Sequence, residues 1–276
     1  MLDLNWNNSY LVGDALIDSE HQRLFEIARN AKNVVEPSMR KQKIRDEVRE
    51  IYEYSKTHFQ HEEEYMHHIG YPYINEHKQE HQKIIEAMSD FIKKLSLISA
   101  VEFEKELAYF IETYMVGHIL LKDKRIAIWK RQNEKIKYSA EFKRDYLVGN
   151  EQIDEEHKKL FTIAAKFFKE HEDKNVKLQT IKDALKELSE YMKFHFDHEE
   201  EFMQTIPFHD FVQRHKKLHE TIINDFNRLI QLIPKLDTDA IELELTHFIE
   251  VNLIHHIVVE DKKIVEYQEK IYKLDD

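Results

Sequence analysis

Histidine is the residue type in this sequence that points most directly to chemistry. The chain of 276 residues has 18 histidines; His77 and His81 are spaced four residues apart, as are His58 and Glu62. Because residues i and i+4 lie on one face of an α-helix, each pair can hold an ion from a single helix. Apolar residues at helical spacing share these faces and place the pairs in a core. A carboxylate buried there alone would be strongly destabilising, so the pattern predicts a bound metal.

The same pattern occurs twice along the chain. Segments 10–13, 17–21 and 58–64 recur at 146–149, 153–157 and 195–201. The offset begins at 136 residues and grows to 138, as single insertions in loops would produce. We therefore expect two tandem domains, residues 1–135 and 136–276, each large enough for its own core. The polar join at 132–141 lacks Gly and Pro and is expected to be helical rather than a flexible tether.

Four helices are expected in each domain, with apolar residues along one face of every helix. In the first domain they span about 19–35, 39–68, 73–97 and 101–129. Pro37 follows the first helix, and the Gly-Tyr-Pro segment at 70–72 ends the second. Short connections between such helices predict an all-α fold of two tandem up-down-up-down four-helix bundles.

Composition and charge exclude several other classes of protein. The absence of Cys rules out zinc ribbons, iron–sulfur clusters, cysteine nucleophiles and disulfide scaffolds. The net charge is −12, with Lys and Arg spread along the chain, so no nucleic-acid partner is expected. The start has no basic and apolar leader, and no stretch of about 18 apolar residues occurs. We expect a cytoplasmic protein with no membrane partner.

One acidic residue in each half has an unusual spacing. Asp123 follows His118 by five residues, and Asp261 follows His256 by five. Five residues do not return to the same face of a regular α-helix. A π-bulge or another distortion would bring the two side chains together. Because the spacing occurs in both halves, it favours a real role for the aspartates.

Seven side chains in each half form the candidate metal site. The first set is His21, His58, Glu62, His77, His81, His118 and Asp123. The second set is His157, His195, Glu199, His215, His219, His256 and Asp261. Imidazole and carboxylate suit Fe, Zn, Cu or Mn. Seven ligands are too many for one tetrahedral zinc and suit two ions bridged by the carboxylates.

Each half resembles a hemerythrin, specifically a bacteriohemerythrin. The resemblance rests on the motifs His58-x-x-x-Glu62, His77-x-x-x-His81 and His118-x4-Asp123, and on their repeats in the second half. It extends over nearly the whole chain, and no ligand of the motif is missing. It implies a non-haem di-iron centre in each domain, hence four irons per chain. The irons would share an oxo or hydroxo bridge and bind O2 reversibly.

The resemblance also implies a role for each ligand. His77, His81 and His118 would hold one iron with every position filled. His21 and His58 would hold the other iron, with one position open for O2, and both carboxylates would bridge. In the second half, His215, His219 and His256 would hold one iron, His157 and His195 the other, with Glu199 and Asp261 as bridges.

Binding of O2 for storage, delivery or buffering is the expected function, with an electron donor for re-reduction and no enzymatic activity. The alternatives are a di-iron oxidase or peroxidase, a nitric-oxide-handling enzyme, a sensor of O2 or iron, and an iron store. The sequence shows no cavity-facing acid or base beyond the ligands, and no motif for an electron-supplying cofactor. With both domains counted, we expect no output domain within these residues.

Residues outside the two ligand sets give four further expectations. His61 and His198 lie in an acidic run and are expected on a solvated face; His67, His68, His171, His209 and His247 are expected at the surface or in loops. His255 is expected not to bind metal, because only His256 keeps the five-residue spacing. Tyr114 precedes His118 by one turn, whereas Asn252 holds the matching place. We therefore expect a more polar pocket in the second half.

Overall fold

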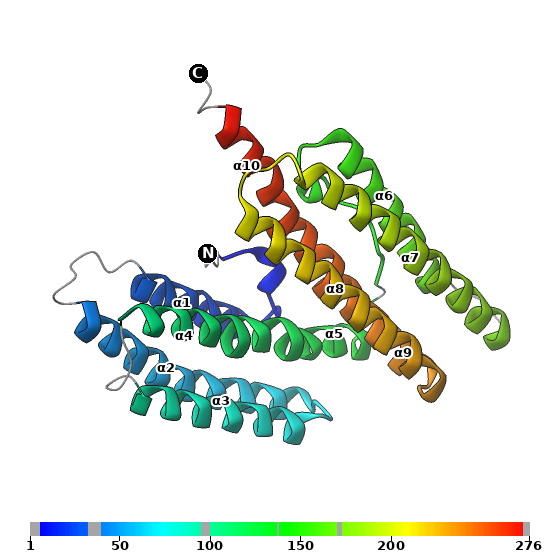
Figure 1. Cartoon of the computed structure of the whole chain (residues 1–276). Coiled ribbons are helices and arrows are strands. Elements are labelled where there is room, and N and C mark those ends of the chain that lie inside the picture. Colours follow the sequence, from blue (N-terminus) through cyan, green and yellow to red (C-terminus); the bar gives the residue numbers. More distant parts are fainter. Residues whose placement is uncertain (1–5, 33–39, 95–99, 137, 170–172, 273–276) are drawn as a thin grey trace. The chain divides into compact units, whose positions relative to one another are not determined.

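The computed structural model describes residues 6–32, 40–94, 100–136, 138–169 and 173–272. Within these ranges the regular elements are all helical, with no β-strand, which confirms the all-α prediction. The chain divides into two compact units, Met1–Glu134 and Lys135–Asp276 (Figure 1). None of the described helices combines the length and apolar character that crossing a bilayer requires.

The described residues of each unit form a bundle of four helical rods (Figure 1). The last rod is long and changes its helical type along its length. The rods of unit 1 are α1 Ala15–Lys32, α2 Arg40–Ile69, α3 Ile74–Lys94, and a fourth that runs from α4 Ala100–Phe110 to α5 Lys124–Asn133. Those of unit 2 are α6 Glu151–Ala164, α7 Lys174–Met203, α8 His209–Leu232, and a fourth from α9 Thr238–Phe248 to α10 Lys262–Tyr272. In unit 1, α2 packs against both α1 and α3; in unit 2, α7 packs against both α6 and α8.

The first helix begins earlier than predicted. α1 starts at Ala15 rather than at 19, because Asp14 accepts hydrogen bonds from the backbone N–H groups of Leu16 and Ile17 and caps the helix. Of the other predicted limits, those at 35, 39 and 97 lie outside the described residues. The predicted limits at 68, 73 and 101 differ by one residue from the observed end of α2 and the observed starts of α3 and α4. The fourth rod continues to Asn133 rather than ending at 129.

A carboxylate near the start of the first helix fixes the preceding loop. Asp18 accepts hydrogen bonds from the backbone N–H groups of Val12 (2.7 Å) and Gly13 (3.1 Å). Gly13 has a φ of 84°, a conformation that side chains other than that of glycine rarely adopt. Asp154 makes the same two bonds in unit 2, to Val148 and Gly149. The repeated sequence around 10–18 is thus explained by a repeated loop structure.

The fourth rod is π-helical around the predicted ligands. In unit 1 the π-helical segments are Ile111–Val116 and Ile119–Asp123, and in unit 2 they are Ile249–Ile254 and His256–Asp261. A π-helix bonds each residue to the one five positions away, so residues five apart lie near one face. This confirms the distortion predicted from the spacing of His118 and Asp123.

The join between the units is not the helix predicted for 132–141. α5 ends at Asn133, and Lys135 has a φ of 57°, in the left-handed region. A left-handed residue just past a helix turns the chain away from the helix axis. The described residues that follow are not helical until Arg144–Tyr146. The prediction was wrong because the absence of Gly and Pro does not prevent Lys from taking this conformation.

Candidate metal centres

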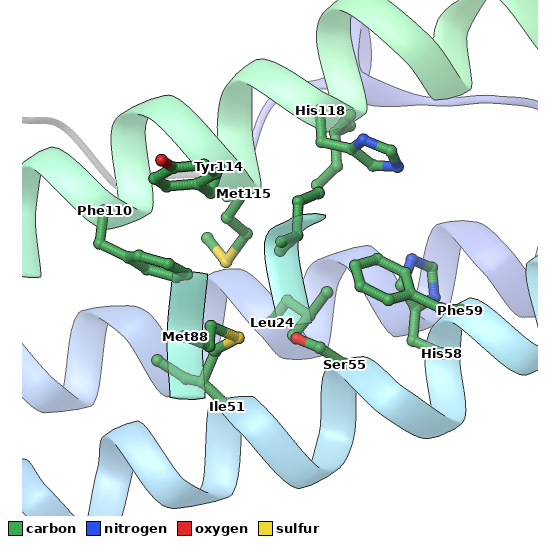
Figure 2. A pocket seen from close by; sticks show the side chains of 12 residues that line it. Leu24, Ile51, Ser55, His58, Phe59, Met88, Phe110, Tyr114, Met115 and His118 are labelled. Carbon is green, nitrogen blue, oxygen red and sulfur yellow. The ribbon is translucent and has the colours of Figure 1, made fainter. Parts of the chain in front are cut away.

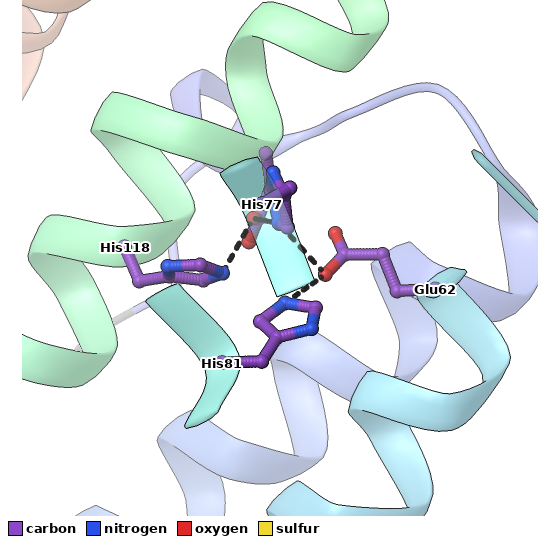
Figure 3. A group of neighbouring side chains, drawn as sticks. Glu62, His77, His81 and His118 are labelled. Carbon is purple, nitrogen blue, oxygen red and sulfur yellow. Dashed lines mark hydrogen bonds and ion pairs between the residues drawn. The ribbon is translucent and has the colours of Figure 1, made fainter. Parts of the chain in front are cut away.

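All seven predicted ligands of unit 1 meet in the core of its bundle. α1 contributes His21, α2 contributes His58 and Glu62, α3 contributes His77 and His81, and the fourth rod contributes His118 and Asp123. Every one of these side chains is buried. Figure 3 shows Glu62, His77, His81 and His118 directed toward one another from three of the rods. Helices that are far apart in sequence therefore bring the set together, as predicted.

The seven side chains form two groups that share both carboxylates. One group is Glu62, His77, His81, His118 and Asp123; the other is His21, His58, Glu62 and Asp123. Within each group the candidate ligand atoms lie within 4.8 Å of one another. The sharing of Glu62 and Asp123 gives the arrangement of two adjacent cation positions with two bridging carboxylates.

The two oxygens of Asp123 face different groups. Its Oδ1 lies 3.0 Å from His118 Nε2 and 3.2 Å from His77 Nε2, whereas its Oδ2 lies 3.3 Å from His21 Nε2. Glu62 Oε2 lies 3.0 Å from His81 Nε2 and 3.4 Å from His77 Nε2. A carboxylate that presents one oxygen to each of two ion positions is placed to bridge them.

Unit 2 repeats this geometry closely. Its groups are Glu199, His215, His219, His256 and Asp261, and His157, His195, Glu199 and Asp261, all buried. Asp261 Oδ1 lies 3.0 Å from His256 Nε2 and 3.3 Å from His215 Nε2, while Oδ2 lies 3.2 Å from His157 Nε2. The two halves of the chain therefore carry the same constellation of donors.

Many of these buried donor atoms have no hydrogen-bond partner. In unit 1 they include Glu62 Oε1, both carboxylate oxygens of Asp123, and Nε2 of His77 and of His118. Buried polar atoms almost always find a partner, and a buried carboxylate without one is strongly destabilising. The atoms lie close together but outside hydrogen-bond geometry, as ligands aimed at a common cation would. The donor set, imidazole and carboxylate without thiolate, fits iron.

Outer carboxylates orient two of the histidines in each unit. Glu20 accepts a hydrogen bond from His58 Nδ1 at 3.0 Å, and Glu63 accepts one from His81 Nδ1 at 3.0 Å. A proton on Nδ1 leaves Nε2 with a free lone pair, which is the form that binds a metal. Unit 2 has the same bonds, from His195 to Glu156 and from His219 to Glu200.

Sequence reasoning missed these outer carboxylates, although a signal for them exists. Glu20 and Glu156 directly precede the predicted ligands His21 and His157, and both lie in a segment that recurs. Glu63 likewise follows Glu62 within a repeated acidic run. Acidic residues in such a run are usually solvated. The sequence of the run therefore does not show which of its glutamates face the core.

His61 and His198, which were expected on a solvated face, are only partly exposed. Their side chains are only 36% and 32% exposed. His61 Nδ1 lies 2.6 Å from Glu20 Oε1, and His198 Nδ1 lies 2.5 Å from Glu156 Oε1. The reason is that each glutamate is buried and needs a partner for its second oxygen.

The other histidines outside the ligand sets behave largely as predicted. His255 is half-buried and belongs to neither ligand group of unit 2. His67, His68 and His209 are exposed, although they lie on helices, and His247 is half-buried on α9. His171 lies outside the described residues.

The carboxylates control the charge state of the cluster. Burial would raise the pKa of Asp123, but the imidazoles beside it, first that of His118, outweigh burial and hold the pKa well below its ordinary value. Burial would lower the pKa of His77, but the carboxylates of Asp123 and Glu62 beside it outweigh burial and raise it to about 10. The pKa of His215 is raised in the same way, to about 9. A cation that binds here must therefore displace a proton from this imidazole.

A small cavity adjoins the cluster of unit 1. Its volume is about 20 Å³, room for the centre of roughly one water-sized molecule. His58, Phe59 and His118 form the wall toward the cluster, and Tyr114 also lines the cavity (Figure 2). Most of the other lining side chains are aliphatic, aromatic or methionine. The position of Tyr114, which differs between the halves, thus reaches the space beside the candidate metal centre.

Comparison with known proteins agrees with this geometry. The family model described as the hemerythrin HHE cation binding domain matches twice, at residues 12–127 and 148–267. A bacteriohemerythrin of Clostridium acetobutylicum is 33% identical over 122 residues, which cover 43% of this chain and 95% of that protein. One from Campylobacter jejuni is 30% identical over 122 residues, covering 44% of this chain and 90% of that protein.

A third relative, the bacteriohemerythrin of Stenotrophomonas maltophilia, is 27% identical over 124 residues, covering 45% of this chain and 79% of that protein. No solved structure matches the chain. Each of these relatives is about as long as one unit, which agrees with a chain built from two copies. Because the family model matches both units over most of their length, the chain belongs to the hemerythrin family, whose domains bind a non-haem di-iron centre.

Proposed function

We propose that each unit binds O2 reversibly at its di-iron centre, and that the protein stores, delivers or buffers O2 without catalysing a reaction. The observation that carries this proposal is the complete set of buried ligands in each unit, which in unit 1 adjoins an apolar cavity against His58 and His118. When bound, a pair of ferrous ions supplies the reducing equivalents that O2 binding requires. The side chains then determine whether O2 is released again or consumed.

The ligand count supports an open position next to this cavity. The group with His77, His81 and His118 offers five protein ligands, whereas the group with His21 and His58 offers four. We assign one iron to each group, with Glu62 and Asp123 as bridges, and the corresponding residues of unit 2 to the same roles. The less saturated ion would thus leave a position for O2 on the side that His58 shares with the cavity.

The apolar walls favour reversible binding over O2 activation. Activation needs protons, and water is the usual carrier that brings them to a buried site. A cavity with few polar groups holds water poorly, because a buried water needs two to four hydrogen-bond partners. Among the lining residues the hydroxyls are those of Ser55 and Tyr114. We also propose that residues 1–135 and 136–276 act as separate O2-binding domains, since each has a complete ligand set.

The test is a cycle of oxygenation on the full chain. After anaerobic loading with ferrous iron, we expect a coloured form to appear under air, fade under argon, and return without loss over several cycles. Zinc-loaded protein is the control, because zinc has no redox chemistry and should remain colourless. Continuous O2 consumption in the presence of a reductant, with peroxide or water as product, would instead identify an oxidase and overturn the proposal.

The two units are expected to autoxidise at different rates. Tyr114 lines the cavity of unit 1, and Asn252 holds the corresponding place in unit 2, where its amide can hydrogen-bond to water. Trp6 in unit 1 and Phe142 in unit 2 hold corresponding positions and also differ in type, but they pack in the same way. Trp6 packs edge-on against Phe25, with 5.5 Å between the ring centroids. Phe142 packs edge-on against Phe161, also at 5.5 Å. They are therefore not expected to contribute to the difference.

Two variants isolate the effect. With unit 1 disabled by His77→Ala, or unit 2 by His215→Ala, the oxygenated colour should fade several-fold faster when unit 2 is the active one. Adding Asn252→Tyr to the faster variant should slow its decay toward the rate of unit 1. Equal decay in the two single-site variants would contradict the proposed asymmetry.

A further inference from the structure

Part of the lining of the unit 1 cavity lies on the side away from the candidate metal centre. From His58 and His118 it reaches Ile51 and Ser55 on α2, Met88 on α3 and Phe110 on the fourth rod (Figure 2). Ser55 is buried, and its short side chain occupies a helix position among much larger neighbours. A small residue at such a position leaves space that a larger side chain would fill.

At two of these lining positions, unit 2 carries a larger side chain than unit 1. Met192 stands where unit 1 has Ser55, and Phe226 stands where unit 1 has Met88. Most of the other lining positions keep the same residue or one of similar size. The two halves thus differ in side-chain size at these two lining positions, while their ligand sets are the same.

Packing in unit 2 shows where these larger side chains go. Met192 and Phe226 are fully buried and belong to one hydrophobic cluster with Phe196 and Leu253. The ring of Phe226 lies 4.9 Å from that of Phe248. In unit 1 the residue that corresponds to Phe248 is Phe110, whose ring stacks on Tyr114 at 5.0 Å instead.

Asn252 is smaller than its counterpart Tyr114, but it does not restore the space that Met192 and Phe226 fill in unit 2. Its counterpart in unit 1, Tyr114, is only half-buried, so part of that ring lies at the outer edge of the cavity. Replacing it by a shorter residue opens the rim rather than the interior. The side chains of Met192 and Phe226 lie in the core itself.

We propose that the cavity of unit 1 is a holding chamber for one small apolar gas molecule, kept open by Ser55, and that Met192 and Phe226 close the equivalent space in unit 2. This deepens the proposed function, on which its physiological role rests. The chamber suits a diatomic gas such as O2, because it is small and its walls are mostly apolar. Unit 1 would then exchange O2 faster than unit 2, although both bind it with the same ligands.

Xenon tests the chamber without relying on O2 chemistry. Crystals of the iron-loaded full chain, pressurised with xenon, should show one anomalous peak per chain, beside Ser55. Ser55→Met should reduce this peak to background, and Met192→Ser should create a second one in unit 2. Met88→Phe makes the second change seen in unit 2 and serves as an independent filling variant if Ser55→Met fails to fold.

Iron content and melting temperature are the controls for these variants. A xenon peak of equal occupancy in both units of the unaltered protein, no peak in either unit, or a peak that persists in a folded filling variant would overturn the proposal. Failure of reversible oxygenation with the xenon pattern intact would instead count against the O2-binding function alone. If oxygenation is reversible but xenon is absent, the chamber is disproved and the function stands.

Discussion

Loading with ferrous iron is expected to raise the free energy of unfolding of each unit by about 4 kcal/mol when free iron exceeds the dissociation constant about a thousandfold. The physical reason lies in the unpartnered atoms of the cluster. Both oxygens of Asp123 and one of Glu62 are buried without a hydrogen bond, and their counterparts in unit 2 are as well. A cation that binds only the folded bundle satisfies all of them at once.

Calorimetry under anaerobic conditions measures this effect. For a unit of this size, about 4 kcal/mol corresponds to a rise in Tm of roughly 10–20 °C. In the His77→Ala variant only the transition of unit 2 should respond fully to iron, because its ligand set is intact. Melting curves of metal-free and iron-loaded protein that coincide would show that the clusters do not depend on metal for stability.

The ligand set could be predicted from the sequence because the sequence carries it twice. A single His-x-x-x-His pair is ambiguous, but two such pairs with the same further residues in both halves are not. The five-residue step from His118 to Asp123 conflicted with a regular helix, and the π-helical segment Ile119–Asp123 resolves that conflict. Here a violation of local periodicity was itself informative about the site.

Other features depend on three-dimensional packing that periodicity does not contain. Glu20 contacts His58 and His61 because α1 packs against α2, and the spacing of residues within one helix does not show this contact. The end of the helix at Lys135 depends on a backbone conformation for which Lys gives no signal. The chamber beside Ser55 depends on the sizes of side chains from all four rods of unit 1. Its signal in the sequence is therefore a difference in residue size between the two halves, not a motif.

A single ligand substitution is expected to remove the iron of one unit and leave the other loaded. The structure presents four groups of ligand atoms, two in each unit, so full loading should give four irons per chain. His77 lies close to both Glu62 and Asp123, which the two ion positions of unit 1 share. His77→Ala removes a ligand at one position, and loss of the ion there leaves both shared carboxylates without one of the two ions that orient them. Loss of iron should therefore extend to the pair, and the content should fall to two.

Matched variants separate ligand loss from general damage to the bundle. His215→Ala should likewise leave two irons, because His215 holds the corresponding place against Glu199 and Asp261. The double variant should bind almost none. His255→Ala is the control: this histidine adjoins His256 in the sequence but belongs to neither ligand group, so four irons should remain.

Metal analysis after anaerobic reconstitution measures the number of irons in each variant. A count of three for His77→Ala would mean that the ions of one unit bind independently. A count of two or fewer for the unaltered chain would contradict two dinuclear centres.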